Sequence, residues 1–374
     1  MRKTLFLCNT VYQLIVLIEL KLSRYYETDV DIIITDTLVD SVKIAEKVGE
    51  LDLFHNVYPL KIKIDNIEYS RIPVRFREKK IKRYLEKQKC YIMYEEYDEY
   101  LFSNVAGIGC VLGEYLKIIN RNLELCMFED GIGSYSEEIY NNFLKRFRNK
   151  NMIKRLYFKI FPHAMNMISR YYLSMPEIFQ WKIPNGADVI KILPPDNKEL
   201  LRKILNHIFE YDGQNKEYED KVIIMEESYH YEKTDVDDMK LFVYIANLIG
   251  KTNLIVKRHP REKEDRFTEL GIKINKDKKM PWEVILLNCN LENVFLITIT
   301  STIAFTSMLL DDRICSRTVL LYKLIDSRSE RFEGLKGAME QLVENSNQSF
   351  WIPETMEQLK NILIKFSDEH KYNV

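Results

Sequence analysis

Short apolar runs alternate with segments of helical periodicity along most of the 374 residues. The runs have the length of buried strands, and the segments between them place apolar residues on one helical face. Strands that alternate with helices form parallel sheets that are covered on both faces, so the pattern predicts an α/β protein. The predicted strands are residues 4–8, 30–35, 98–103, 123–128, 188–193, 221–225, 253–257, 293–298 and 318–322. The predicted helices are residues 11–23, 110–119, 197–209, 236–249, 281–288, 302–310 and 355–366.

The alternation occurs twice, once in each half of the chain. This predicts two Rossmann-like domains with parallel sheets facing a central cleft, and roughly 100–200 residues per domain also gives two. Pro176, Pro184 and Gly186 interrupt the pattern between the halves. We therefore expect domains of residues 1–178 and 179–374. Ligands of such folds bind at the carboxyl ends of the strands, so residues that directly follow a strand are the first candidates for a site.

Composition and charge exclude some classes of protein. Apolar residues make up 46% of the chain and charged residues 30%, which indicates a globular protein and not a disordered one. The formal net charge of -1 gives no overall indication of nucleic-acid binding, and we expect no nucleic-acid partner. Residues 139–176 differ locally, because they contain no Asp or Glu and interleave basic with aromatic residues. They form either a solvated basic helix pair or a surface that docks on anionic lipid or a lipid-linked acceptor.

The cysteines and histidines give no indication of a disulfide framework or a zinc site. The six cysteines form no C-x-x-C pair and several lie in apolar runs, so we expect buried thiols in a reducing, cytoplasmic setting. No histidine has a second one three to five residues away. Asp29-Val30-Asp31 and Asp235-Val236-Asp237 resemble the D-x-D metal motif, but they open a predicted strand and a predicted helix. We expect no metal at either.

The amino-terminal apolar run resembles a signal peptide in its composition. Tyr12 and Gln13 interrupt it, Glu19 and Lys21 close it, and no small-residue cleavage site follows. It is therefore predicted to form the first core strand and helix. No stretch of the chain approaches about 18 uncharged apolar residues, so no transmembrane helix is predicted.

Basic residues and a histidine follow the apolar run 253–257, in the segment Lys257-Arg258-His259-Pro260. The proline ends the strand and fixes the backbone behind His259. Lys257 lies two residues earlier and so faces the same side. A cation and an imidazole at a strand end suit a phosphate leaving group, because the cation offsets charge and the imidazolium donates a proton or hydrogen bond. A structural His-Pro turn is the alternative interpretation.

A carboxylate pair, Glu129 and Asp130, follows the predicted strand 123–128 and precedes Gly131. Adjacent carboxylates raise each other's pKa, which helps one of them act as a base near neutral pH. The glycine lets the chain turn sharply and lets a substrate approach the backbone. An acidic turn with no catalytic role is equally compatible with these residue types.

Hydroxyl residues Thr300, Ser301 and Thr302 follow the predicted strand 293–298 and can open a helix. Backbone N–H groups at a helix start, together with hydroxyls, bind anions, although a plain helix cap has the same sequence. Glu283, in the first turn of the predicted helix 281–288, can accept hydrogen bonds from a ribose. Taken alone, it is a favourable acid at a helix start.

The order of these motifs resembles that of bacterial sialyltransferases: a carboxylate pair with glycine, then His-Pro, then a Ser/Thr pair. The opening Leu5-Phe6-Leu7-Cys8-Asn9-Thr10-Val11-Tyr12-Gln13 and the run Lys257–Glu262 look like one branch of them. That branch holds the lipooligosaccharide sialyltransferase of Neisseria and the capsular sialyltransferases of streptococci. The resemblance spans most of the chain.

The resemblance implies a GT-B fold and an inverting, metal-independent transfer from CMP-sialic acid to a terminal galactose. The acceptor would belong to a bacterial surface glycan of capsule or lipooligosaccharide type, and the linkage would be α-2,3. Residues 1–178 would then form the acceptor domain and residues 179–374 the CMP-sugar domain. No cofactor is implied. Relatives dimerise, so a homodimer is a further expectation, as is peripheral contact with the cytoplasmic face of the inner membrane.

The resemblance also assigns roles by motif. His259 would be the general acid on the departing phosphate, and Glu283 would hold the cytidine ribose. Lys257, Ser301 and Thr302 would hold the CMP phosphate, with Thr300 close by. Asp130, or its neighbour Glu129, would deprotonate the acceptor. In the Neisseria relative the base lies about twenty residues before His-Pro, and there this chain offers Asp235, Asp237 and Asp238; we prefer Asp130 for its strand-end, glycine-flanked position.

Two other functions remain open at the level of sequence. The first is another GT-B transferase that uses CDP-glycerol or a UDP- or dTDP-sugar, because CDP-glycerol transferases also carry His-Pro segments. The second is a membrane-surface binding protein built on a degenerate transferase fold, which rests on residues 139–176.

Overall fold

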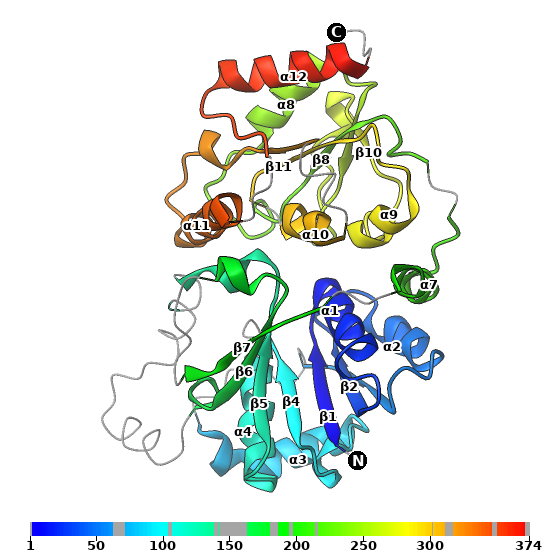
Figure 1. Cartoon of the computed structure of the whole chain (residues 1–374), viewed down its shortest axis with the longest axis vertical. Coiled ribbons are helices and arrows are strands. Elements are labelled where there is room, and N and C mark those ends of the chain that lie inside the picture. Colours follow the sequence, from blue (N-terminus) through cyan, green and yellow to red (C-terminus); the bar gives the residue numbers. More distant parts are fainter. Residues whose placement is uncertain are drawn as a thin grey trace. The chain divides into compact units, whose positions relative to one another are not determined.

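The computed structural model describes residues 2–62, 72–103, 107–137, 141, 163–179, 186–193, 197–213, 216–300, 302–310, 317–345 and 350–370. The chain divides into two compact α/β units (Figure 1). The first unit takes the chain up to Asp130 and from Glu137 to Glu210. The second takes Gly131–Ser136 and the chain from Tyr211 onward. Each unit is built on its own parallel sheet.

The first unit holds a seven-stranded sheet in the order β3-β2-β1-β4-β5-β6-β7, and every pairing is parallel. Its strands are β1 (Lys3–Cys8), β2 (Asp29–Thr35), β3 (Asn56–Leu60), β4 (Glu99–Phe102), β5 (Glu124–Phe128), β6 (Ile168–Leu173) and β7 (Asp188–Lys191). Its α-helices are α1 (Val11–Leu22), α2 (Ser41–Gly49), α3 (Glu78–Lys87), α4 (Gly107–Ile119) and α7 (Lys198–Phe209). Strands β1 and β2 are buried on both faces, which explains why they read as continuous apolar runs.

The second unit holds a five-stranded parallel sheet in the order β10-β9-β8-β11-β12. Its strands are β8 (Val222–Met225), β9 (Leu254–Lys257), β10 (Lys273–Ile274), β11 (Phe295–Thr298) and β12 (Thr318–Leu320). Its helices are α8 (Met239–Ile249), α9 (Trp282–Asn288), α10 (Thr302–Leu310), α11 (Glu330–Asn345) and α12 (Met356–His370). Figure 1 shows α8 and α12 on one face of this sheet and α9, α10 and α11 on the other.

Each sheet reverses its direction of growth once, as Rossmann-like sheets do. In the first sheet the reversal lies between β1 and β4, and in the second it lies between β8 and β11. Such a switch point is where open α/β sheets place their ligands, outside the carboxyl ends of the strands. The order of the strands therefore directs attention to the residues that follow β8 and β11 in the second unit.

The predicted fold class, two parallel α/β domains, is confirmed, but the division of the chain differs from the prediction. The boundary expected at 178/179 falls between β6 and β7, which pair with each other in the first sheet. The contacts divide later, at Glu210 and Tyr211. The Pro and Gly residues near 176–186 therefore punctuate a connection inside one sheet. The elements absent from the prediction are β3, β6, β10, α2, α3 and α11.

In the part of the chain that the structure describes, no helix combines the length and the apolar character needed to span a bilayer.

Candidate active site

Lys257 ends β9 as a buried cation. Its side chain donates to the carbonyl oxygens of Arg258 (3.4 Å) and Lys278 (3.2 Å). Burial lowers the pKa of Lys257 to about 8, against the attraction of the nearby carboxylates of Asp277 and Glu283. The ammonium is therefore charged at neutral pH, and among the described residues the acceptors of its hydrogen bonds are two backbone carbonyls. Such a cation is available to an anionic ligand.

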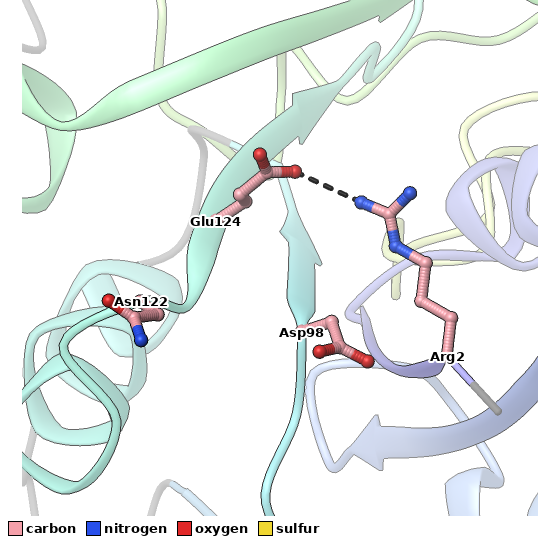
Figure 2. A pocket seen from close by; sticks show the side chains of 4 residues that line it. All are labelled: Arg2, Asp98, Asn122 and Glu124. Carbon is pink, nitrogen blue, oxygen red and sulfur yellow. Dashed lines mark hydrogen bonds and ion pairs between the residues drawn. The ribbon is translucent and has the colours of Figure 1, made fainter.

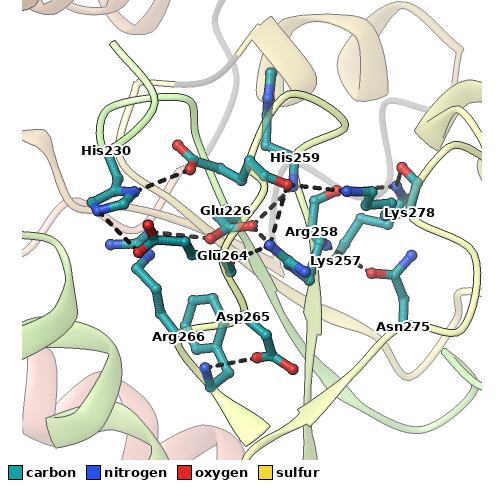
Figure 3. Close-up of polar contacts among 12 residues, drawn as sticks. Glu226, His230, Lys257, Arg258, His259, Glu264, Asp265, Arg266, Asn275 and Lys278 are labelled. Carbon is teal, nitrogen blue, oxygen red and sulfur yellow. Dashed lines mark hydrogen bonds and ion pairs between the residues drawn. The ribbon is translucent and has the colours of Figure 1, made fainter. Parts of the chain in front are cut away.

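Glu226, which directly follows β8, holds the backbone of the His-Pro segment. Its carboxylate accepts hydrogen bonds from the backbone N–H of His259 (3.1 Å), from Arg258 Nε (3.4 Å) and from Arg266 Nη2 (3.1 Å). Figure 3 shows these side chains gathered around Glu226. Arg266 is fixed in turn by Asp238, at 2.8 and 3.0 Å. A buried ion network that spans β8 and β9 thus sets the position of His259.

The ring of His259 has a defined orientation. Its Nδ1 accepts a hydrogen bond from the backbone N–H of Arg261 at 3.2 Å. In the neutral ring the proton then lies on Nε2, so that nitrogen is the hydrogen-bond donor of the ring. The residue is half-buried. Its position and orientation suit a general acid at the end of a central strand.

Replacing Glu226 with glutamine is expected to destabilise this network while keeping an acceptor for the His259 N–H. Arg258 and Arg266 would then lose a buried counter-charge, and breaking a buried pair costs about 3–5 kcal/mol. Urea unfolding curves should show a loss of that size. Glu264→Gln is the matched control, because its side chain is 75% exposed beside His230 and should change stability by less than about 0.5 kcal/mol. Equal losses in the two variants would contradict the role given to Glu226.

Glu227 organises the other side of the switch point. Its buried carboxylate accepts from the backbone N–H groups of Ile299 and Thr300, both at 2.8 Å, and from the hydroxyls of Thr298 and Thr300, both at 3.1 Å. Tyr229 also hydrogen-bonds the Thr300 hydroxyl. The hydrogen bonds of Thr300 therefore hold the chain after β11 in place, which favours a positioning role over direct contact with a ligand.

The remaining predicted donor-site residues lie at the same edge of the second sheet. Thr302 is half-buried in the first turn of α10. Glu283 is buried in the first turn of α9, where burial raises its pKa and the Thr306 hydroxyl and the Lys257 charge oppose that rise. Ser301 lies outside the described residues. Because β9, β8 and β11 are neighbours in the sheet, the segments that follow them meet at one edge.

The two carboxylates after β5 have different surroundings. Glu129 is fully buried and accepts from the Tyr12 hydroxyl (2.5 Å), the Ser174 N–H (2.8 Å) and the Ser174 hydroxyl (2.5 Å). Asp130 is half-buried, and its Oδ1 accepts from the Thr10 hydroxyl at 3.3 Å. The Thr10 side chain also caps α1. Glu129 thus serves as a structural anchor, and Asp130 is the more accessible of the two.

Gly131, the residue after the carboxylate pair, lies close to Thr302. Its backbone has a φ of +73°, and a Cβ at this position would lie 2.3 Å from Thr302 Cγ2 and 2.5 Å from Thr302 Oγ1. The segment Gly131–Ser136 belongs to the second unit, where Tyr135 packs against Phe305 of α10 at 5.2 Å between ring centroids. Gly131 therefore lies against the first turn of α10 within the second unit.

Gly131→Ala is expected to destabilise the second unit through both a steric clash and the positive φ. With a ψ of -161°, this backbone conformation is essentially restricted to glycine and costs another residue about 1–3 kcal/mol, and the collision with Thr302 adds to it. Gly213→Ala is the matched control, because Gly213 has a φ of +75° and nothing within 4 Å of its built Cβ. Thermal unfolding should show a larger loss for Gly131→Ala, and an equal loss would mean that Thr302 yields freely.

The three alternative carboxylates before the His-Pro segment also differ in their partners. Asp238 is buried in its pair with Arg266. Asp235 accepts from the Ser327 hydroxyl (2.5 Å) and the Arg328 N–H (2.7 Å), and these bonds lower its pKa. Asp237 is exposed and lies 2.9 Å from Lys240. Asp235 and Asp237 are both exposed, but the Asp235 carboxylate is held by Ser327 and Arg328, whereas Asp237 lies beside an exposed lysine.

Among the described residues, one group has the spacing of a metal site: Asp29, Asp31 and His55. Asp31 is fully buried, and its two oxygens already accept from Asn56 (2.9 Å) and from the Tyr97 hydroxyl (2.5 Å). Lys3 lies 3.7 Å away and offsets its charge. These bonds occupy the oxygens that a metal would need. The cluster also lies where β2 and β3 begin, at the edge of the sheet opposite Asp130.

A polar pocket lies near the same amino-terminal edge, lined by Arg2, Asp98, Asn122 and Glu124 (Figure 2). Arg2 pairs with Glu124 at 3.0 Å and with the buried Glu99 at 3.0 Å. Arg170 pairs with the same two glutamates, so two arginines offset the charges of Glu99 and Glu124 within the protein. We infer that the side chains around this pocket hold the starts of β1, β4 and β5 together.

Comparison with solved structures defines the class of the fold. Arabidopsis thaliana UGT89C1 complexed with UDP-L-rhamnose is similar, with a TM-score of 0.53 and 11% identity over 99% of this chain and 93% of that one. The alpha/beta-galactoside alpha-2,3-sialyltransferase of Photobacterium phosphoreum matches with a TM-score of 0.49 and 10% identity, over 94% of this chain and 98% of that one. The fold is that of the GT-B glycosyltransferases. No curated protein matches the chain.

The particular family follows from the sequence. The model of the family described as alpha-2,8-polysialyltransferase (POLYST) matches residues 4–314. This is most of the chain, so the chain belongs to that family and is a glycosyltransferase of the sialyltransferase class. The broad resemblance to sialyltransferases is confirmed. The narrower likeness to the Neisseria and streptococcal enzymes stays a prediction.

Proposed function

We propose that the chain transfers sialic acid from CMP-sialic acid to the end of a bacterial surface glycan. One observation carries the proposal: a buried ammonium, that of Lys257, and an oriented imidazole, that of His259, both lie at the carboxyl end of β9. The family match is the reason for proposing sialic acid as the transferred sugar. The buried ammonium and the oriented imidazole support a site for a single phosphate.

The donor phosphate would lie against Lys257, Thr302 and the amino-terminal end of α10. A cation, a hydroxyl and backbone N–H groups can together offset the charge of a phosphate diester and of the sialic acid carboxylate. Glu283, at the start of α9, would accept hydrogen bonds from the cytidine ribose. Lysine and histidine would then take the place of a divalent ion, so no cofactor would be required.

The transfer would pass through an oxocarbenium-like state, as other glycosyl transfers do. The acceptor oxygen forms a bond to the anomeric carbon as the bond from that carbon to the phosphate oxygen breaks. Asp130 takes the proton of the acceptor hydroxyl, and His259 Nε2 donates to the departing phosphate. Attack on the face opposite the leaving group inverts the anomeric configuration.

The acceptor has two candidates. The sequence resemblance implies a terminal galactose and an α-2,3 linkage. The description of the matching family names α-2,8-polysialyl transfer, in which sialic acid itself is the acceptor. Both use the same donor and the same proposed acid and base.

The test combines the protein with CMP-sialic acid and either lactose or sialyllactose, with EDTA present. We expect CMP release with a sialylated product, whose linkage an α-2,3-specific sialidase then identifies. If sialyllactose is extended and lactose is not, the acceptor is sialic acid and not galactose, and the proposed donor is unchanged. Turnover with CDP-glycerol or with a UDP- or dTDP-sugar, and none with CMP-sialic acid, would overturn the proposal. Loss of turnover in EDTA would overturn its metal-independent part.

A cytoplasmic setting, a homodimer and contact with the inner membrane surface through residues 139–176 stay predictions. Of that stretch, the structure describes residue 141 and residues 163–176.

A further inference from the structure

A second part of the first unit combines exposed apolar side chains with basic ones. Ile72 and Phe76 are 56% and 72% exposed, and Tyr91 and Tyr94 are 47% and 60% exposed. Apolar groups of this size are rarely so exposed in one place without a partner surface. They flank α3, since Phe76 belongs to the 3-10 turn Val74–Arg77 that leads into it and Tyr94 to the turn Ile92–Tyr94 that follows it.

The helix between these turns is strongly basic on its outer side. Ile81, Tyr84 and Leu85 are its buried residues, and the Tyr84 hydroxyl donates to the Lys61 carbonyl at 2.6 Å. The exposed basic residues of the helix and its flanks are Arg75, Lys79, Lys80, Lys82, Arg83, Lys87 and Lys89. Seven positive charges against Glu78 and Glu86 leave this surface clearly cationic, although the whole chain has a net charge of -1.

Basic and aromatic side chains meet beside α3. Lys82 Nζ lies 5.0 Å from the centre of the Tyr94 ring, and the Tyr94 hydroxyl donates to Glu86 at 2.6 Å. The rings of Tyr91 and Tyr94 are 6.4 Å apart. We call this surface the α3 face and define it as Ile72, Phe76, Tyr91, Tyr94 and the seven basic residues named above.

We propose that the α3 face docks on a membrane surface of anionic phospholipid. Basic side chains attract the lipid headgroups, while Phe, Ile and Tyr suit the boundary between headgroup and acyl chain. A polyanionic glycan or RNA would use the positive charges but would leave Ile72 and Phe76 in water. The combination of charge and exposed apolar area therefore favours lipid.

The position of the α3 face is compatible with catalysis on a membrane-borne acceptor. Tyr94 precedes β4 by a few residues, so this part of the surface lies at the amino-terminal edge of the first sheet. Figure 1 shows α3 near the labelled N-terminus of the chain. Asp130 follows the carboxyl end of β5, at the other edge. Docking through the α3 face would leave the Asp130 edge open.

The test is flotation of the full chain with vesicles of phosphatidylcholine and phosphatidylglycerol in equal parts, and with vesicles of phosphatidylcholine alone. We expect flotation with the anionic vesicles that is lost at high salt. Lys79→Gln/Lys80→Gln/Arg83→Gln should weaken binding on the order of 100-fold, at about fivefold for each charge. Phe76→Ser should weaken it on the order of tenfold.

The matched control is Lys191→Gln/Lys198→Gln/Lys203→Gln, which removes the same charge from exposed positions on β7 and α7. It should float like the wild type. Equal flotation of the α3-face variant and the wild type would overturn the proposal, as would retention on immobilised polysialic acid without binding to anionic vesicles. Flotation needs no turnover, so its result is independent of the proposed transferase activity.

Discussion

His259→Ala is expected to lower kcat for sialyl transfer by about 10²–10⁴-fold, the usual contribution of a general acid. The Nε2 proton would no longer reach the departing CMP phosphate. The fold should survive, because Glu226 holds the backbone N–H of residue 259 and not its ring. The measurement is CMP release under saturating donor, with thermal unfolding as a check on folding.

His230→Ala is the matched control for the acid. His230 is a 45% exposed imidazole in the same network, 3.3 Å from Glu262 and 3.7 Å from Glu264. Its loss should leave kcat nearly unchanged. A donor with a leaving group that needs no proton, such as a p-nitrophenyl sialoside, should suffer less from His259→Ala than CMP-sialic acid does. Transfer by His259→Ala at the wild-type rate would rule out the acid role.

Asp130→Asn is expected to lower kcat by about 10²-fold or more, because an amide cannot accept the proton of the acceptor hydroxyl. The amide oxygen can still accept the hydrogen bond from Thr10, so the start of α1 should stay in place. The activity remaining should also lose the rise with pH that a titrating base produces. The measurement is kcat across a pH series for the wild type and the variant.

Two further variants separate the candidate bases. Asp237→Asn removes an exposed carboxylate of the second unit and should leave kcat close to that of the wild type. Glu129→Gln should act mainly on stability, since Glu129 is buried and anchors Tyr12 and Ser174. If Asp237→Asn loses activity and Asp130→Asn does not, the base belongs to the second unit.

The ion network explains why the acid and its support are different kinds of residue. Glu226 and Arg258 are buried, and both Arg258 and the partly buried Arg266 are bonded to Glu226, so these residues act by holding the chain. His259 is half-buried, so its ring can meet a ligand. Loss of the network should appear first in stability, whereas loss of the imidazole should appear in rate.

Several features of this protein were predictable from its sequence alone. Buried parallel strands are apolar on both faces, so runs such as 4–8 and 253–257 can be recognised as strands from the sequence. Residues that follow such runs lie at the carboxyl edge, which is why Lys257, His259 and Asp130 could be singled out. The edge strand β3, by contrast, contains Pro59 and is only partly buried, so its pattern is weak.

Other features were decided only by the tertiary structure. The acids Glu226 and Glu227 follow the apolar run of β8 as plainly as Asp130 follows β5, but sequence does not show which acid is bonded and which is open. That depends on partners distant in the chain, such as Arg266 for Glu226 and Ser174 for Glu129. The contact of Gly131 with Thr302 and the exposure of Phe76 likewise could not be predicted from the local sequence. Local pattern determines which edge of a sheet a residue occupies, because that follows from strand direction, whereas its role depends on which distant side chains satisfy its charge.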